Sequence, residues 1–99
     1  MSDLLDTYKK LINVELPQKY QHPVRYNHCF ARIILDWLFD DCWYNHLDRK
    51  KNAGAQLTDE QLQRAITRMQ LWLQTHDVLI SDNQQSLVHR RKYADIRKA

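Results

Sequence analysis

Glycine and proline are scarce in this chain of 99 residues: Gly54 is the one glycine, and the prolines are Pro17 and Pro23. Both residue types mark tight turns and interrupt regular elements. A fold of many short strands joined by tight turns therefore conflicts with this composition, which favours long helices. The length allows one domain with a single modest core and leaves no room for a separate cofactor domain.

Long apolar runs and numerous cysteines are lacking too. No segment approaches the roughly 20 apolar residues that span a bilayer, and the start MSDLLDTYKK does not have the basic and then apolar pattern of a signal peptide. Two cysteines, Cys29 and Cys42, do not make a disulfide framework. If both lie on one helix, about 20 Å separate them, which is beyond bridging distance. We therefore expect two reduced thiols in a cytoplasmic protein.

Charge is distributed unevenly along the chain. The net charge is +3, whereas residues 89–99 alone hold five cations and one acid and so carry +4. The rest of the chain is therefore close to neutral, and the basic character belongs to the C-terminal segment. The apolar content of 43% and the charged content of 27% are typical of a soluble globular protein.

The N-terminal part of the sequence predicts one helix followed by a connector. Ser2 can cap this helix, whose apolar residues recur at helical spacing: Leu4, Leu5, Tyr8, Leu11 and Ile12. We expect the helix to stop before Pro17, because the residue preceding a proline avoids helical geometry. Residues 16–25 should then form an extended connector, which Tyr20 and Val24 hold against the core.

Two further helices follow from the apolar pattern. The second is expected over residues 26–50, and its apolar arc is wide enough to predict a long central helix that neighbours contact on several sides. The third should begin at Thr58 and run to about Thr75. Its start is well marked, because Thr58 and Gln61 have the spacing of a capping box.

A fourth helix is predicted over residues 82–97, since Ser81 and Gln84 repeat the capping signature. Its apolar face is thin: Leu87, Val88, Tyr93 and Ile96. We expect its first half to dock on the bundle and the residues from about 90 to fray. The sequence as a whole predicts one all-α domain over residues 1–99, a small bundle of three to four helices around the long second helix.

A polar stripe follows the second predicted helix at steps of four residues: His28, Arg32, Asp36 and Asp40. Arg32 and Asp36 can pair at this spacing, whereas Asp36 and Asp40 repel each other unless a metal or a cation from another helix lies between them. We interpret the stripe first as solvated or interhelical ion pairs. A binding surface, or a metal-assisted or acid–base site, is the alternative.

The segment around Cys42 is dense in aromatic residues. Cys42 and His46 could act as a nucleophile and its base, but a cysteine between aromatic residues is typical of a small buried hydrophobe. Trp37 lies on the apolar face and should be buried, whereas Trp43 and Tyr44 are better candidates for exposure and for gripping a partner. The cysteine and histidine spacings match no zinc motif, so we expect no metal.

Two further segments carry cations that suit anionic ligands. The C-terminal helix offers Arg90, Arg91, Lys92 and Arg97, which could neutralise nucleic-acid phosphates. The same cations also suit a solvated helix end, where they complement the helix dipole. Arg25 precedes the start of the second helix, where backbone N–H groups attract small anions.

The run PVRYNHCFARIILDWLFDDCWYNHL resembles a segment of short bacterial proteins of unassigned role, some of which are labelled acetyltransferases by automatic transfer. The resemblance covers about the first half of the chain and implies no mechanism. An acetyltransferase needs a glycine-rich turn after a strand to hold the pyrophosphate of coenzyme A. The one glycine and the helical pattern conflict with that requirement, so the label is wrong or points to a partner.

These patterns favour a small helical binding or regulatory module that acts without catalysis, through protein contacts, and needs no cofactor. Self-association is a natural extension, because the second helix has more apolar arc than short neighbours cover. One alternative is a small enzyme, metal-assisted or a transferase, and the other is nucleic-acid binding through the C-terminal helix. The enzyme would use His28, Asp36, Asp40 or Cys42. The predicted protein-binding surface comprises Arg25, His28, Arg32, Asp36, Asp40, Trp43 and Tyr44.

Overall fold

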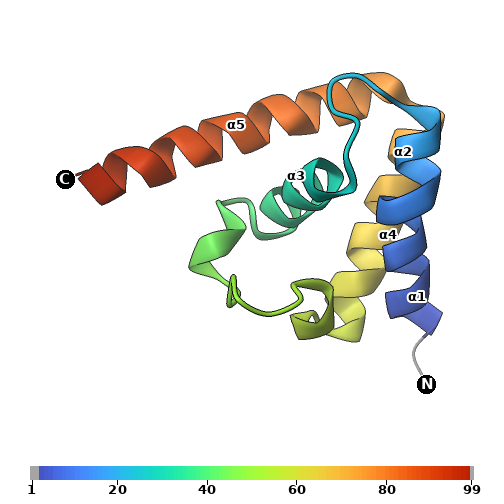
Figure 1. Ribbon diagram of the computed structural model, residues 1–99, viewed down its shortest axis with the longest axis horizontal. Coiled ribbons are helices and arrows are strands. Elements are labelled where there is room, and N and C mark those ends of the chain that lie inside the picture. The colour runs from blue at the N-terminus through green and yellow to red at the C-terminus, as the bar shows by residue number, and fades with distance from the viewer. Residues whose placement is uncertain (1–2, 99) are drawn as a thin grey trace.

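The computed structural model describes residues 3–98, with side chains described through residue 95, and shows an all-α bundle (Figure 1). No strand occurs within residues 3–98. The predicted fold class is therefore confirmed. The helical segments, in chain order, are α1 (Asp3–Lys10), η1 (Leu11–Glu15), α2 (Leu16–Lys19), α3 (Asn27–Phe39), η2 (Trp43–Asn45), η3 (Gly54–Gln56), α4 (Asp59–Gln74) and α5 (His76–Lys98).

The N-terminal helix continues past Pro17, so the prediction that it stops before this residue is wrong. A π-helical turn, η1, joins α1 to α2, and the backbone N–H of Leu16 donates to the carbonyl of Leu11 across it. A proline lacks the N–H of an α-helical hydrogen bond, and its ring clashes with the carbonyl four residues earlier. The wider π turn accommodates both features. Ser2, the predicted cap, lies outside the described residues.

The connector between α2 and α3 is shorter than predicted and packs against the bundle. It begins at Tyr20, because residues 16–19 are helical. The Tyr20 hydroxyl donates to the carbonyl of Trp72 at 2.7 Å, and both Tyr20 and Val24 pack on the core. The expectation that these two side chains hold the connector down is therefore confirmed.

The second predicted helix ends about ten residues earlier than expected. α3 spans 13 residues and stops at Phe39, after which Asp40 adopts the left-handed conformation with φ of 50°. The N–H of Asp40 donates to the carbonyl of Trp37, and that of Asp41 to the carbonyl of Asp36. These bonds close the helix end and turn the chain away from the helix axis. The prediction of one helix through residue 50 is wrong, and Cys42 therefore does not share a helix with Cys29.

The start of α4 follows the sequence pattern, whereas the start of α5 does not. The Thr58 hydroxyl accepts from the N–H of Gln61, and the Gln61 side chain accepts from the N–H of Thr58, which confirms the capping box. Only Thr75 separates α4 from α5, which begins at His76. Ser81 therefore lies inside α5, and the predicted start of this helix at residue 82 is wrong.

The core lies where α3 crosses the other helices. In Figure 1, α1 runs beside α4, α5 passes across α3, and the C-terminal part of α5 extends away from the bundle. The apolar face of α3 is buried within this single chain, so it does not require a second copy to cover it. The α3 contribution to the core consists of Phe30, Ile33, Ile34, Leu35 and Leu38.

The predicted apolar face of α5 serves its docking only in part, through Tyr93, which contacts Tyr44 edge to face. Leu87 and Val88 are exposed, whereas the side of α5 that faces the bundle after Leu79 is largely polar. The side chain of Ile96 lies outside the description. The fraying expected from about residue 90 stays a prediction. No helix within residues 3–98 is long and apolar enough to cross a membrane.

The left-handed residue after α3 gives a direct stability test. Asp40→Gly should leave the free energy of unfolding unchanged or raise it by up to about 1 kcal/mol, because glycine adopts this conformation without steric cost. Asp40→Val should lower it by about 1 kcal/mol or more, since a β-branched residue is strained there. Urea unfolding followed by circular dichroism measures both values. Equal stability of the two variants would contradict the assigned helix end.

Candidate functional site

A buried polar cluster joins α3 to α5 and organises the candidate site. At its centre, Asp36 is fully buried, with an exposed fraction of 0%. Its carboxylate accepts from the Ser86 hydroxyl at 2.6 Å, from the Arg90 guanidinium at 3.0 and 3.3 Å, and from the backbone N–H of Trp43 at 3.0 Å. A buried carboxylate is tolerated only when its charge is compensated and its lone pairs are satisfied, and Asp36 meets both conditions.

Arg32 extends the same cluster along α3. Its guanidinium donates to the Ser86 hydroxyl at 2.7 Å and to the Asn83 side-chain oxygen at 2.8 Å. Ser86 therefore accepts from Arg32 and donates to Asp36, so the hydroxyl links the two residues. The predicted direct pairing of Arg32 with Asp36 does not form. Asp36 pairs instead with Arg90 of α5. This is an interhelical ion pair, which was the first interpretation of the stripe.

A second ion pair ties α4 to the start of α5. Arg68 donates from Nε and Nη2 to both carboxylate oxygens of Asp82, at 2.8 and 2.9 Å. The indole N–H of the buried Trp72 donates to the same carboxylate at 2.8 Å. Bidentate pairs of this kind fix geometry as well as charge. Two buried carboxylates thus hold α5 in place: Asp36 on α3 and Asp82 on α5 itself.

The electrostatics of the cluster follow from burial and charge. Burial alone would lower the pKa of Arg90, but the hydrogen bonds and charge of Asp36 outweigh this effect, and the pKa is raised. The hydrogen bond to Asp82 raises the pKa of Arg68. Burial, together with the charge of Arg90, lowers the pKa of Arg32. All three guanidinium groups remain cationic near neutral pH, so the cluster keeps its charges there.

The seven residues of the predicted binding surface fall into separate places. Asp36 is buried, so its assignment to an exposed surface is wrong. Arg32 is half-buried in the α3–α5 contact. Asp40 is exposed beyond the end of α3, and one of its oxygens lies 3.5 Å from Nε2 of the buried His89. Arg32 and Asp36 thus hold α5 against α3, and Asp40 lies at the edge of this contact.

The other four predicted surface residues lie at the two ends of α3. Arg25 and the exposed Tyr26 precede α3, and the Arg25 guanidinium lies over the Tyr26 ring. Tyr26 also stacks on His28, which lies in the first turn of the helix. Trp43 and Tyr44 come after the helix and contact each other edge to face. Both are half-buried. About 18 Å of helix separates His28 from Asp40, so the seven residues do not form one continuous patch.

The predicted nucleic-acid residues also serve different roles. Arg90 is bound to Asp36 and is therefore unavailable to an external phosphate. Arg91 and Lys92 are exposed on α5, and the side chain of Arg97 lies outside the description. Two of the four predicted cations thus remain on the described surface.

The residues predicted for the enzyme alternative do not converge. His28 is exposed at the start of α3, Asp36 is saturated by hydrogen bonds, and Cys42 is buried. Burial raises the pKa of the Cys42 thiol, which disfavours the reactive thiolate. His46 contacts Asp41 at 3.1 Å and stacks on Phe39, and it makes no hydrogen bond with Cys42 among the described side chains. Within the described residues, no group of three or more His, Cys, Asp or Glu side chains could hold a metal ion.

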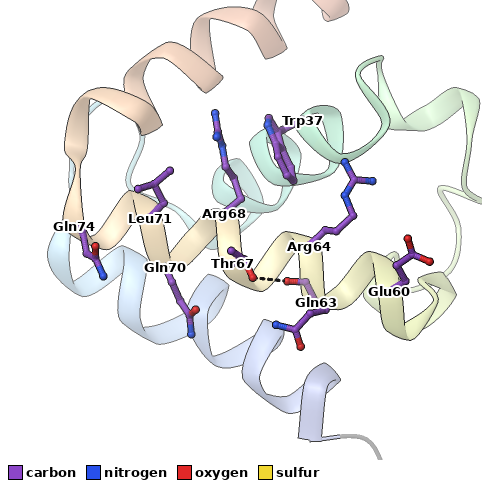
Figure 2. Close-up of a pocket in the computed structure, with 9 residues that line it drawn as sticks. All are labelled: Trp37, Glu60, Gln63, Arg64, Thr67, Arg68, Gln70, Leu71 and Gln74. Carbon is purple, nitrogen blue, oxygen red and sulfur yellow. Dashed lines mark hydrogen bonds between the residues drawn. The ribbon is translucent and has the colours of Figure 1, made fainter.

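An open groove of about 720 Å³ runs along the outer face of α4 (Figure 2). Arg64 and Arg68 extend from α4 toward Trp37 of α3, with guanidinium carbons 5.5 and 5.0 Å from its ring. Leu71 is exposed on the same face. Trp37, which the sequence predicts to be buried, is half-buried and forms one wall. The remaining lining residues are Glu60, Gln63, Thr67, Gln70 and Gln74.

This groove was not predicted from the sequence, because the periodic apolar residues of α4 mark its inner face and not its outer one. A signal was present: Arg64, Arg68 and Leu71 recur at i, i+4 and i+7, which places them on one side of a helix. That Trp37 completes the groove depends on how α3 crosses α4, and no local pattern encodes this crossing.

Comparison with known proteins supplies no further assignment. No protein-family model matches the chain, and no curated protein and no solved structure is significantly similar to it.

The buried ion pair predicts a large and specific loss of stability. Asp36→Asn removes the charge that compensates Arg90, so it should lower the free energy of unfolding by at least about 2 kcal/mol. Asp95→Asn, the same change at an exposed site on α5, should alter it by less than about 0.5 kcal/mol. Urea unfolding measures both. Similar losses for the two variants would show that Asp36 does not hold α5 in place.

The two free cysteines should differ in reactivity. Under native conditions near pH 8, iodoacetamide should alkylate the half-buried Cys29 well before Cys42, because Cys42 is inaccessible and its pKa is raised. In urea both thiols should react at similar rates. Peptide mass spectrometry over time follows each site, and fast labelling of Cys42 in the folded protein would contradict its burial.

Proposed function

We propose that the protein is a non-catalytic binding module and that the α4 groove is its protein-binding face. The observation that carries this proposal is the grouping of Trp37, Arg64 and Leu71 around an open groove. Tryptophan and arginine are favoured anchors of protein interfaces, and an exposed leucine beside them adds apolar area. Catalysis is less well supported, since the candidate catalytic residues lie apart.

The shape of the groove favours a helical segment of the partner. Its lining follows α4 from Glu60 to Gln74, about 21 Å along the axis. A helix laid in such a groove buries apolar side chains at i, i+3, i+4 and i+7. The three glutamines of the lining offer both donors and acceptors to a polar rim.

The charges of the groove favour a partner with an acidic residue at the contact. Arg68 is neutralised by Asp82, whereas Arg64 makes no ion pair among the described residues. Arg64 can therefore pair with an acid of the partner while its guanidinium stays over Trp37. A second copy of this chain is one such partner, and self-association remains part of the proposal.

Two other elements of the proposal rest on weaker observations. The free thiols Cys29 and Cys42 suit a reducing compartment, so we place the protein in the cytoplasm. The resemblance to short bacterial proteins stays a proposal as well. An acetyltransferase activity is not supported, because residues 3–98 include no strand that a glycine-rich turn could follow.

A photo-crosslinking experiment tests the groove. A photoreactive amino acid at Gln70, in the groove, should crosslink a protein in cells that produce this chain naturally, whereas one at Gln84, exposed on α5, should not. Leu71→Lys should abolish the crosslink, because a charge opposes burial of the site. Leu87→Lys is the matched control, since Leu71 and Leu87 are 37% and 47% exposed.

Mass spectrometry of the crosslinked product identifies the partner and distinguishes a second copy from another protein. A crosslink that persists in Leu71→Lys, or none from Gln70 in any background, would contradict the proposed face.

A further inference from the structure

Three consecutive cations, Arg49, Lys50 and Lys51, are exposed in a loop whose backbone is held in place. The Gln56 side chain accepts from the N–H of Asp48 at 2.9 Å, and it donates to the carbonyls of Asp48 at 2.9 Å and Asn52 at 3.3 Å. It therefore joins the two ends of the loop. The Asp48 carboxylate also accepts from the N–H of Lys50 at 2.9 Å. A loop fixed in this way loses little entropy when it binds a ligand.

Arg49 is oriented by a stack that begins in the core. Its guanidinium carbon lies 3.8 Å from the centroid of the Tyr44 ring, and that of Arg90 lies 4.3 Å from the same centroid. Arg90 is fixed by the buried Asp36. The edge-to-face contact of Tyr44 with Tyr93, at 5.5 Å, connects the stack to the distal half of α5.

Among the described arginines that lie over an aromatic ring, Arg49 and Arg64 keep unused donors, and Arg49 lies closer to its ring, at 3.8 Å against 5.5 Å. Arg90 pairs with Asp36, Arg68 with Asp82, and Arg25 donates to the hydroxyl of Tyr26. Arg49 makes no hydrogen bond or ion pair with any described residue, and it is exposed. Its N–H edge is thus available to a ligand oxygen.

We propose that this surface binds single-stranded nucleic acid. Unpaired bases stack on aromatic rings and on guanidinium planes, and stacked guanidinium groups still donate to phosphate through their edges. The guanidinium group of Arg49 provides both a plane on which a base can stack and an N–H edge that can donate to a phosphate. Lys50 and Lys51 neutralise the adjoining phosphates. The exposed Arg91 and Lys92 extend the positive charge along α5.

A single strand fits these features better than a duplex or an acidic protein. The bases of a duplex are stacked on one another and cannot reach Arg49 without being unpaired. An acidic polypeptide would pair with the cations of the surface, but it has no base to stack on the guanidinium plane of Arg49. The site is separate from the α4 groove, because it is built from the 48–52 loop, η2 and α5. It therefore does not depend on the proposed protein-binding function.

The test is fluorescence anisotropy of a labelled single-stranded oligouridine, titrated with the full chain at low and at moderate salt. Arg49→Gln should weaken binding about tenfold, the value expected for losing one stacked base and one phosphate contact. Arg49→Lys keeps the charge but loses the plane, so it should also weaken binding. Arg25→Gln is the matched control, since it removes another exposed arginine that lies over a different tyrosine ring, and it should leave affinity unchanged within about twofold.

Salt dependence supplies a second readout that folding defects do not imitate. Neutralising Lys50 and Lys51 together should make the dependence of log affinity on log salt shallower by about 1.4, as expected for two phosphate contacts to a single strand. Circular dichroism checks that each variant retains its helices.

Several outcomes would overturn the proposal. They are no binding at about 100 μM protein, equal losses for Arg49→Gln and Arg25→Gln, or equal affinity for a duplex of the same length. Polyglutamate that competes as well as the oligonucleotide, with Arg49→Lys binding like the unmodified chain, would instead assign the surface to acidic polypeptides.

Discussion

The ion pair of Asp36 with Arg90 is the constraint on which the arrangement of the helices depends. A carboxylate with no solvent exposure must be compensated, and Asp36 is bound by three residues from two parts of the chain. Ser86 and Arg90 come from α5, 50 and 54 residues away in the sequence, and the N–H of Trp43 comes from the chain just after α3. One carboxylate thus fixes where α5 lies, and it also holds the segment in which the chain leaves α3.

This arrangement explains why α5 has its polar side toward the bundle. The buried positions of α5 after Leu79 include Asp82, Asn83, Ser86 and His89, whereas Leu87 and Val88 face solvent. Apolar packing alone would favour the opposite orientation. The polar side is buried because α3 presents Arg32 and Asp36 there, and satisfied polar groups specify a single docking geometry more strictly than apolar contacts do.

The two ion pairs that hold α5 in place each support one of the proposed binding surfaces. Asp82 holds Arg68 beside Trp37, so the wall of the α4 groove depends on the position of α5. On the other side, Arg90 forms the inner layer of the stack that orients Tyr44 and Arg49. Each surface therefore contacts a buried carboxylate through its arginines: Arg68 binds Asp82, and Arg90 binds Asp36.

The sequence by itself determined the helical class and the features that depend on neighbouring residues. The capping box at Thr58 and the apolar faces of α3 and α4 could be predicted, because their periodicity and hydrogen bonds lie within one or two turns. Predictions from local patterns were wrong where an alternative local geometry was available, as at Pro17 with its π turn, at the left-handed Asp40, and at Ser81 inside α5. Only the tertiary structure decided that Asp36 is buried, that Arg90 serves it, and that Trp37 lines a groove with α4. The reason is physical: the partner of a buried charge, and the walls of a groove, are set by residues far apart in the chain that meet only when the helices cross.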